Sequence, residues 1–398
     1  MSIDQAAGPV TLTADQAADQ SLATGAVGTA LLSVERALAG SGGWRDAHER
    51  IRQVTAGPID AAAHAGLYYG APAIAFLLHA VGTGGHPRYR AAATTLDYPV
   101  LRLIRRRLTA AENRMKRGGP AQFREYDLFY GLTGLGALLL HRLPGSDTFA
   151  DVLRYLIRLT EPRREDGEGG LELPGWWVPH DPDRLLPTPG GHANLGMAHG
   201  AAGVLALLAL GISHGRIVDG QAEAVETLGS WFDRWRQDSA DGPWWPQWIT
   251  REELRTGRLL QKGPVRPSWC YGAAGIARAL QLAGLATGDT VRRATAEQAL
   301  AACLADRQLD RITEAGLCHG LAGVYQTAFR AASDAGSPAI AQRLPALASV
   351  LIRRTTAPDT EGEGAGFLTG SAGVSLALET ARHTAPPCSG WDTCLLIA

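Results

Sequence analysis

The stretch GLAGVYQTA, residues 320–328, begins with two glycines three residues apart and continues as an apolar segment. This Gly-x-x-Gly pattern, always followed by an apolar segment, occurs seven times, with its leading glycine at 25, 70, 131, 200, 272, 320 and 370. The second copy departs from it, because Ala73 replaces the second glycine. One such motif is a weak signal, but seven copies before the same kind of segment indicate an internal repeat.

Each repeat predicts a pair of helices. The segments between the copies include TVRRATAEQALAACLAD (290–306) and AIAQRLPALASVLIRRT (339–355), whose apolar residues recur about every 3.6 positions. The glycine-led helix is apolar on all sides and is expected to be inner, while the amphipathic helix is expected to be outer. Such hairpins stack as an open solenoid or close into a ring. Because glycines allow inner backbones to approach closely, we favour an all-α fold, an α/α toroid of seven helical hairpins.

Closure of the ring can be tested at the two ends of the chain. In a toroid, the helix after Gly370 must pack against the helix after Gly25. We expect this contact to bury four apolar side chains, Leu31, Leu32, Val374 and Leu376.

The bulk composition fits one large domain. The chain has 398 residues, of which 45% are hydrophobic, which is enough for a sizeable core. We expect a single domain over residues 1–398, with loop insertions around 141–192 and 238–265. Trp, Pro and Gly are concentrated there, at 165–191 and 241–248, so these loops either bind a ligand or pack as ordinary surface loops.

Charge and cysteine usage exclude several classes of protein. The net charge is −1, without the basic patch that nucleic-acid binding requires. No stretch of 18 residues is apolar enough to predict a membrane span, and the N-terminus has no features of a signal peptide. Five irregularly spaced cysteines do not form a disulfide framework, so we expect a cytoplasmic protein with reduced thiols.

Three residues are candidate metal ligands. When the repeats are aligned on their leading glycine, Cys270 and Cys318 fall at the same position, and His319 follows Cys318 directly. Neighbouring hairpins of a ring bring equivalent positions together, so the three side chains should converge. Three such ligands are typical of a catalytic zinc with an open fourth position. A buried cysteine beside a capping histidine is the alternative. The shared register favours one Zn²⁺ per chain.

A second histidine falls in the same register. His199 precedes Gly200 as His319 precedes Gly320. It should therefore face the same end of the ring, where it is a candidate general acid or base. A helix cap or a loop contact is the alternative interpretation.

Four stretches carry a resemblance to a known family: RPSWCYGAAG (266–275), CHGLAG (318–323), NLGMAHGAAG (194–203) and YDLFYGLTG (126–134). They resemble the lanthionine synthetase C family, the cyclases of lanthipeptide biosynthesis, and the likeness extends to WDTCLLI (391–397). It implies the same toroid of seven hairpins.

The resemblance also assigns roles to single residues. It places Cys270, Cys318 and His319 at the zinc ligands and His199 at the active-site histidine of the family. Two polar partners, Asp127 and Arg266, complete the catalytic set. Asp127 would either orient His199 or pair with Arg266.

The implied activity is that of a zinc-dependent lanthionine synthetase. It would add Cys thiols of a dehydrated precursor peptide to dehydroalanine or dehydrobutyrine, forming thioether rings. The chain length suggests a free-standing cyclase, with a separate dehydratase and an exporter as partners and a cytoplasmic location, or a membrane association through such a complex.

Two alternatives to this activity stay open. One is the addition of a small thiol such as glutathione to dehydrated residues, and the other is a peptide-binding scaffold with a structural zinc. Other zinc toroids, such as prenyltransferase β-subunits, need an Asp ligand, for which no stretch matches.

Overall fold

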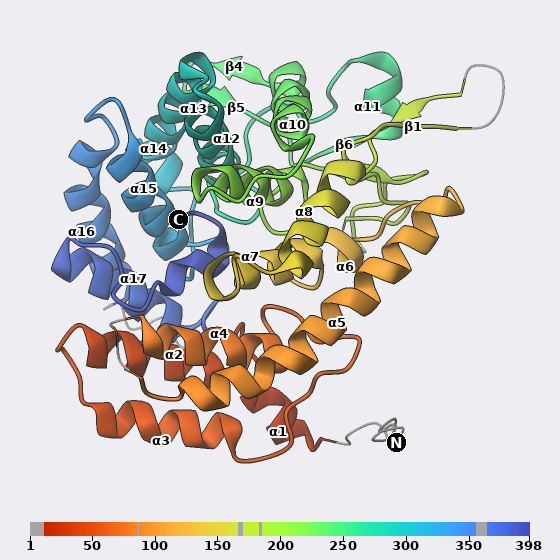
Figure 1. Ribbon diagram of the computed structural model, residues 1–398. Coiled ribbons are helices and arrows are strands. Elements are labelled where there is room, and N and C mark those ends of the chain that lie inside the picture. The colour runs from red at the N-terminus through yellow and green to blue at the C-terminus, as the bar shows by residue number, and fades with distance from the viewer. Residues whose placement is uncertain (1–11, 84, 86, 166–169, 183–184, 356–363) are drawn as a thin grey trace, which may run out of the picture.

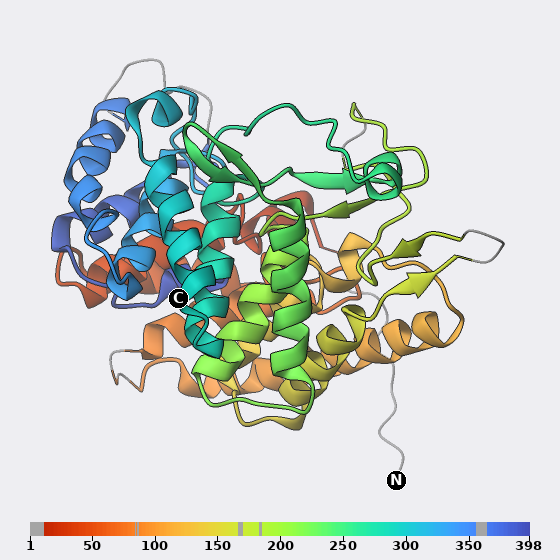
Figure 2. The same ribbon diagram turned by 90° about the horizontal axis from the view of Figure 1, so that it is seen from above.

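A computed structural model describes residues 12–398 except 84, 86, 166–169, 183–184 and 356–363. The N-terminal residues 1–11, on which the signal-peptide prediction rests, lie outside the described part. The described helices form an inner and an outer layer, as Figures 1 and 2 show from two directions.

Seven inner helices follow the seven repeat glycines. They are α2 (Ala26–Leu38), α4 (Ala71–Gly82), α7 (Leu132–Arg142), α9 (Ala201–Ser213), α12 (Ala273–Thr287), α15 (Leu321–Asp334) and α17 (Ser371–His383). Most of their side chains are buried on every side; in α9 the buried run extends from Ala201 to Gly211 without interruption. This all-round burial is what an inner helix between two neighbours and an outer layer requires.

The outer layer is amphipathic. Its long helices are α3 (Trp44–Thr55), α5 (Arg90–Lys116), α8 (Asp147–Leu159), α10 (Gln221–Trp235), α13 (Thr290–Cys303) and α16 (Leu344–Thr355). In α8, Val152 and Leu156 are buried while Arg154 is exposed. The short helices α1 (Ala14–Asp19), α6 (Phe123–Tyr126), α11 (Arg251–Thr256), α14 (Asp306–Leu309) and η1 (Ala341–Arg343) lie in connections.

The ring of inner helices is closed, which confirms the predicted toroid. Each inner helix contacts the next one in chain order, and α17 contacts α2. Leu31, Val374 and Leu376 are buried as expected. Leu32 is only half-buried, contrary to expectation, because it lies one residue, and therefore about 100°, around α2 from Leu31.

The last hairpin departs from the pattern of the others. After α17 the chain forms the short helix η2 (Trp391–Leu395), and this C-terminal tail turns into the centre of the ring. Opposite sides of the ring hold it there: Tyr68 Oη donates to Cys394 O at 2.9 Å, and Trp269 Nε1 donates to Leu395 O at 3.0 Å. The tail therefore fills the middle of the toroid.

Short strands occupy the connections on both sides of α9 and α10. They are β1 (Arg163–Arg164), β2 (Glu172–Leu173), β3 (His192–Asn194), β4 (Gln237–Ser239), β5 (Gly242–Trp244) and β6 (Trp248–Thr250). β1 pairs with β2, β4 with β5, and β3 with β6, all antiparallel. The β3–β6 pair joins the two regions in which we expect insertions. Residues 166–169 and 183–184 of the first region lie outside the described part, and the proposed boundaries stay a prediction.

The repeat glycines are required by close contacts inside each loop. A Cβ on Gly134 would lie 1.9 Å from Leu128 O, and one on Gly275 would lie 2.0 Å from Trp269 O. In the six copies that have one, the second glycine thus packs on the carbonyl group six residues before it. The expected close approach between neighbours also exists, because a Cβ on Gly28 would lie 3.0 Å from Phe367 N.

Candidate metal centre and active site

The loops before the inner helices are joined to one another around the ring. Six backbone hydrogen bonds of 2.8–3.1 Å connect neighbouring loops: Leu22 N to Tyr68 O, Leu128 N to Ala198 O, Ala198 N to Cys270 O, Cys270 N to Cys318 O, Cys318 N to Leu368 O, and Leu368 N to Ala23 O. These bonds hold equivalent positions of adjacent repeats at equal height. They bring the predicted site residues together at one end of the toroid.

Cys270, Cys318 and His319 form a compact cluster. Their potential ligand atoms all lie within 4.8 Å of one another, and no other group of three such residues in the described part of the chain meets this condition. Cys270 is buried, while Cys318 and His319 are partly exposed. Cys270 Sγ also lies 3.8 Å from Ser268 Oγ.

The electrostatics of the cluster favour a cation. The side chain of Cys318, with His319, holds the pKa of the Cys270 thiol well below its usual range, although burial acts in the opposite direction. Interaction with Cys270, together with burial, raises the pKa of Cys318, and Cys270 also raises the pKa of His319. The pair therefore favours one thiolate, which His319 stabilises. Two sulfur donors and one imidazole suit zinc, so the residues present fit the predicted metal.

His199 is paired with a buried carboxylate. Its Nδ1 lies 2.5 Å from Asp127 Oδ2, and the Asp127 side chain is fully buried. The other oxygen, Asp127 Oδ1, accepts hydrogen bonds from Tyr130 N at 2.7 Å and Gly131 N at 2.8 Å. Asp127 is thus fixed by the start of α7 and in turn fixes the tautomer and direction of the His199 ring.

Aromatic rings surround His199. Phe123 and Phe129 stack on it with ring centroids at 5.3 Å and 5.0 Å, and Tyr271 lies at 5.9 Å. Among the described residues, none makes a hydrogen bond with His199 Nε2. This nitrogen is the atom that can exchange a proton with a substrate.

Arg266 lies in a different pair from the one considered in the sequence. Its Nη1 donates to both carboxylate oxygens of Glu314 at 2.7 Å, so Asp127 pairs with His199 and not with Arg266. Burial opposes ionisation of Glu314, but hydrogen bonds from Arg266 and Thr313 lower its pKa to about 2. The Arg266–Glu314 pair ties the loop before Cys270 to the loop before Cys318.

Comparison with known proteins gives the family. Residues 16–396 match the profile described as lanthionine synthetase C-like protein. The chain belongs to the lanthionine synthetase C-like family.

Two individual proteins agree with this membership. This chain is 24% identical over 206 residues to a curated relative, the nisin biosynthesis protein NisC of Lactococcus lactis subsp. lactis. That alignment covers 51% of this chain and 48% of NisC, about half the length of the relative. The solved structure of a nisin cyclase superposes with a TM-score of 0.77 at 20% identity, covering 96% of this chain and 92% of that chain. At this identity the likeness concerns the toroidal fold.

Several residues of the site were not predicted for this lanthionine synthetase C-like protein. Glu314, Phe123 and Phe129 contact predicted site residues. Two of them had a signal in the register, because Glu314 stands at the repeat position of Arg266 and Phe129 at that of Cys270 and Cys318. Tyr271 had a signal that was not used, because it directly follows Cys270 as His319 follows Cys318. Burial, and then the neighbouring Cys270, raise the Tyr271 pKa, so its hydroxyl stays protonated beside His199.

The described part of the chain contains no helix with the length and apolarity needed to cross a membrane.

Proposed function

We propose that this protein is a zinc-dependent peptide cyclase. It adds Cys thiols of a dehydrated precursor peptide to dehydroalanine or dehydrobutyrine and forms lanthionine or methyllanthionine rings. The observation that carries this proposal is the convergence of Cys270, Cys318 and His319 within 4.8 Å beside the His199–Asp127 pair. Family membership and the name of the nisin cyclase support it.

Cys270, Cys318 and His319 would hold one zinc ion per chain. When bound, the ion supplies Lewis acidity that lowers the pKa of a substrate thiol, which is otherwise about 8.5. With three protein ligands, one coordination position is left for the substrate.

His199 manages the proton of the addition. The substrate sulfur forms a bond to the β-carbon of the dehydrated residue, and the π electrons move onto the α-carbon and its carbonyl group. His199 Nε2 then delivers a proton to the α-carbon, while Asp127 Oδ2 holds Nδ1 and stabilises the charged ring. One proton leaves the thiol and one is gained at carbon, so the peptide mass is unchanged.

Arg266 acts as a positioning residue in this scheme. Through Glu314 it fixes the separation of the loops that carry Cys270 and Cys318. The dehydrated substrate implies a separate dehydratase that acts earlier. An exporter and a cytoplasmic location remain predictions.

The activity is tested with a synthetic peptide that contains one Cys and one dehydroalanine. With the zinc-loaded protein we expect the free thiol to disappear while the peptide mass stays constant. If the mass instead rises by one glutathione when glutathione is supplied, the protein is a small-thiol transferase. If zinc binds and neither product forms, the scaffold interpretation is favoured.

The metal assignment is tested by zinc analysis of the purified protein. We expect about one zinc per chain in the wild type and little in Cys270→Ala or Cys318→Ala. Cys388→Ala is the matched control, because Cys388 is an exposed free cysteine outside the cluster. Full zinc occupancy in both ligand variants would contradict the assignment.

A further inference from the structure

One junction of the loop ring differs from the other six. Among the described residues, no backbone hydrogen bond joins the loop before α4 directly to the loop before α7. The loop before α4 is also the one whose motif has Ala73, and its leading Gly70 has a φ of 72°, whereas the other six have negative φ values. The ring of loops is therefore connected differently at this point.

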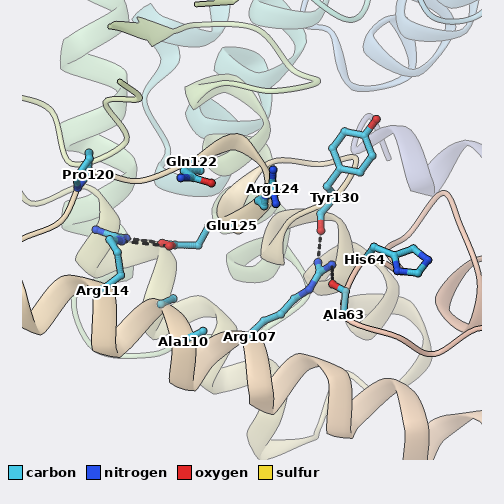
Figure 3. Close-up of a pocket in the computed structure, with 11 residues that line it drawn as sticks. Ala63, His64, Arg107, Ala110, Arg114, Pro120, Gln122, Arg124, Glu125 and Tyr130 are labelled. Atoms are coloured by element: carbon cyan, nitrogen blue, oxygen red, sulfur yellow. Dashed lines mark hydrogen bonds and ion pairs between the residues drawn. The ribbon is translucent and has the colours of Figure 1, made fainter. Parts of the chain in front are cut away.

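The side chain of Arg107, from the outer helix α5, bridges the two loops. Its Nη2 donates to Ala63 O at 2.7 Å and to Ala65 O at 2.8 Å, and its Nη1 donates to Tyr130 O. Figure 3 shows the guanidinium group of Arg107 between Ala63 and Tyr130. Arg107 thus links the two loops, which also pack directly on each other, since the Tyr68 and Phe129 rings stack at 4.6 Å.

A cavity of about 730 Å³ occupies this space between α5 and the loop around α6. Its wall includes Ala63 and His64 from one loop, and Gln122, Arg124 and Tyr130 from the other. A volume of this size is within the usual range for a ligand pocket.

The cavity carries uncompensated positive charge. Of its three arginines, Arg114 is neutralised by Glu125, which it contacts through two nitrogens. Arg107 is bonded to carbonyl oxygens and has no carboxylate within ion-pair distance in the described part of the chain. Arg124 is exposed, and no ion pair to a described residue involves it. The wall therefore presents two positive charges to an occupant.

Tyr130 connects the wall of the cavity to the candidate active site. Tyr130 O accepts from Arg107, Tyr130 N donates to Asp127 Oδ1 at 2.7 Å, and the Tyr130 ring stacks on His199 at 6.3 Å. The cavity and the His199–Asp127 pair therefore lie on either side of the same residue, Tyr130.

We propose that this cavity binds an acidic segment of the substrate peptide that flanks the reacting residues, with Asp or Glu carboxylates facing Arg107 and Arg124. The proposal rests on the proposed cyclase function, because it names where the rest of the same substrate lies. The exposed Arg124 and the charge of Arg107, which no carboxylate of the described chain pairs, match acidic side chains. Tyr130, which lines the cavity and contacts His199, places such a segment beside the reacting centre.

The test measures binding separately from chemistry. Two fluorescein-labelled peptides share a central segment in which Ala replaces both Cys and dehydroalanine, so that neither reacts. One carries a flank of Asp and Glu, and the other carries the same flank as Asn and Gln. By fluorescence anisotropy at low salt, we expect the wild type to bind the acidic peptide about tenfold more tightly. Arg124→Glu should abolish this preference.

The control variant is Arg343→Glu, because Arg343 is also exposed but precedes α16, outside the cavity. It should keep the preference for the acidic peptide. Equal affinity of the wild type for both peptides overturns the proposal, as does an equal loss of preference in both variants, which would indicate only a general effect of net charge.

The same proteins are then assayed with reactive versions of the two peptides. Cyclisation of both peptides with equal KM, and no anisotropy difference, contradicts the docking site and leaves the cyclase function standing. A tenfold anisotropy difference without any cyclisation contradicts the cyclase function and leaves the acidic-peptide site standing. The two failures are therefore distinguishable.

Discussion

At the scale of single residues, the His199–Asp127 pair is the contact that the sequence left undecided. Asp127 could have oriented His199 or paired with Arg266, and the structure places it 2.5 Å from His199. The choice follows from burial, because the Asp127 side chain is fully buried and Arg266 is more than a third exposed. A buried carboxylate needs donors from its immediate surroundings, and the imidazole and two backbone N–H groups supply them.

Asp127→Asn tests this pair. The Asn carbonyl oxygen can still accept from Tyr130 N and Gly131 N, but its NH₂ group would face His199 Nδ1 and favour the opposite tautomer. We expect the cyclisation rate to fall about 10²–10⁴-fold while zinc content stays at the wild-type level. Rates are measured by thiol loss from the dehydrated peptide, and His199→Ala should give a reduction of similar size.

The control for this prediction is Asp310→Asn, since Asp310 is exposed and its side chain has no hydrogen bond within the described chain. It should be as active as the wild type. A loss of zinc in Asp127→Asn would mean that the His199–Asp127 pair stabilises the loops that carry Cys270, Cys318 and His319, and does not act in proton transfer.

The metal ligands were predictable because register is a property of the repeat. Cys270 and Cys318 occupy the same repeat position, so one alignment was enough to place them together. Glu314 also shares its repeat position with Arg266, since both precede their leading glycine by the same number of residues, so the register could have predicted this pair as well. Phe123 shares its position with no other site residue and meets His199 only through tertiary packing. No local pattern specifies such a contact between distant segments.

At the scale of helices and loops, the glycine repeat predicted the inner helices and part of the reason for the glycines. They were expected to let neighbouring backbones approach, and Gly28 does so, since its Cβ would lie 3.0 Å from Phe367 N. The sequence did not show that the second glycine also packs on the carbonyl group of its own loop, as Gly134 does on Leu128 O. In the second copy, which has Ala73 at this place, Gly70 has a φ of 72°.

Gly134→Ala tests this account of the motif. A Cβ at Gly134 would lie 1.9 Å from Leu128 O, so the loop or the helix must shift. We expect a loss of about 1–3 kcal/mol or more in the free energy of unfolding, measured by urea denaturation. Gly82→Ala on the inner helix α4 is the matched control, because nothing lies within 4 Å of its Cβ position. That variant should be as stable as the wild type or more stable by about 0.5–1 kcal/mol.

At the scale of the whole molecule, the sequence predicted the closed ring but not what fills it. Closure was predicted from seven repeats of one glycine motif, and the contact between α17 and α2 confirms it. The sequence did not predict the position of the tail, whose segment WDTCLLI (391–397) entered only through the family resemblance. A 3₁₀ helix this short shows no hydrophobic periodicity from which a packing face could be predicted. Its partners, among them Tyr68 and Trp269, come from separate repeats.

Asp392 anchors the tail within the ring. Its side chain is completely buried and accepts from Gln326 Nε2 and from two nitrogens of Arg330 at 2.6–2.7 Å. Both donors belong to α15, the inner helix that follows the loop of Cys318 and His319. On another side of the ring, Trp269 donates to the tail and directly precedes Cys270. The tail thus contacts the helix that follows the Cys318–His319 loop and the residue that precedes Cys270.

Asp392→Ala is therefore expected to affect both stability and metal binding. Removing the carboxylate leaves the Arg330 charge, which is 18% exposed, without its partner. Such a change typically costs about 3–5 kcal/mol, and urea denaturation should show it as a lower midpoint. Because the tail also holds Trp269, zinc should dissociate faster in a chelator-competition assay, whereas the exposed Asp310→Asn should match the wild type in both measurements. If Asp392→Ala lost stability but kept the wild-type rate of zinc release, the tail would stabilise the core without affecting the loops that carry Cys270, Cys318 and His319.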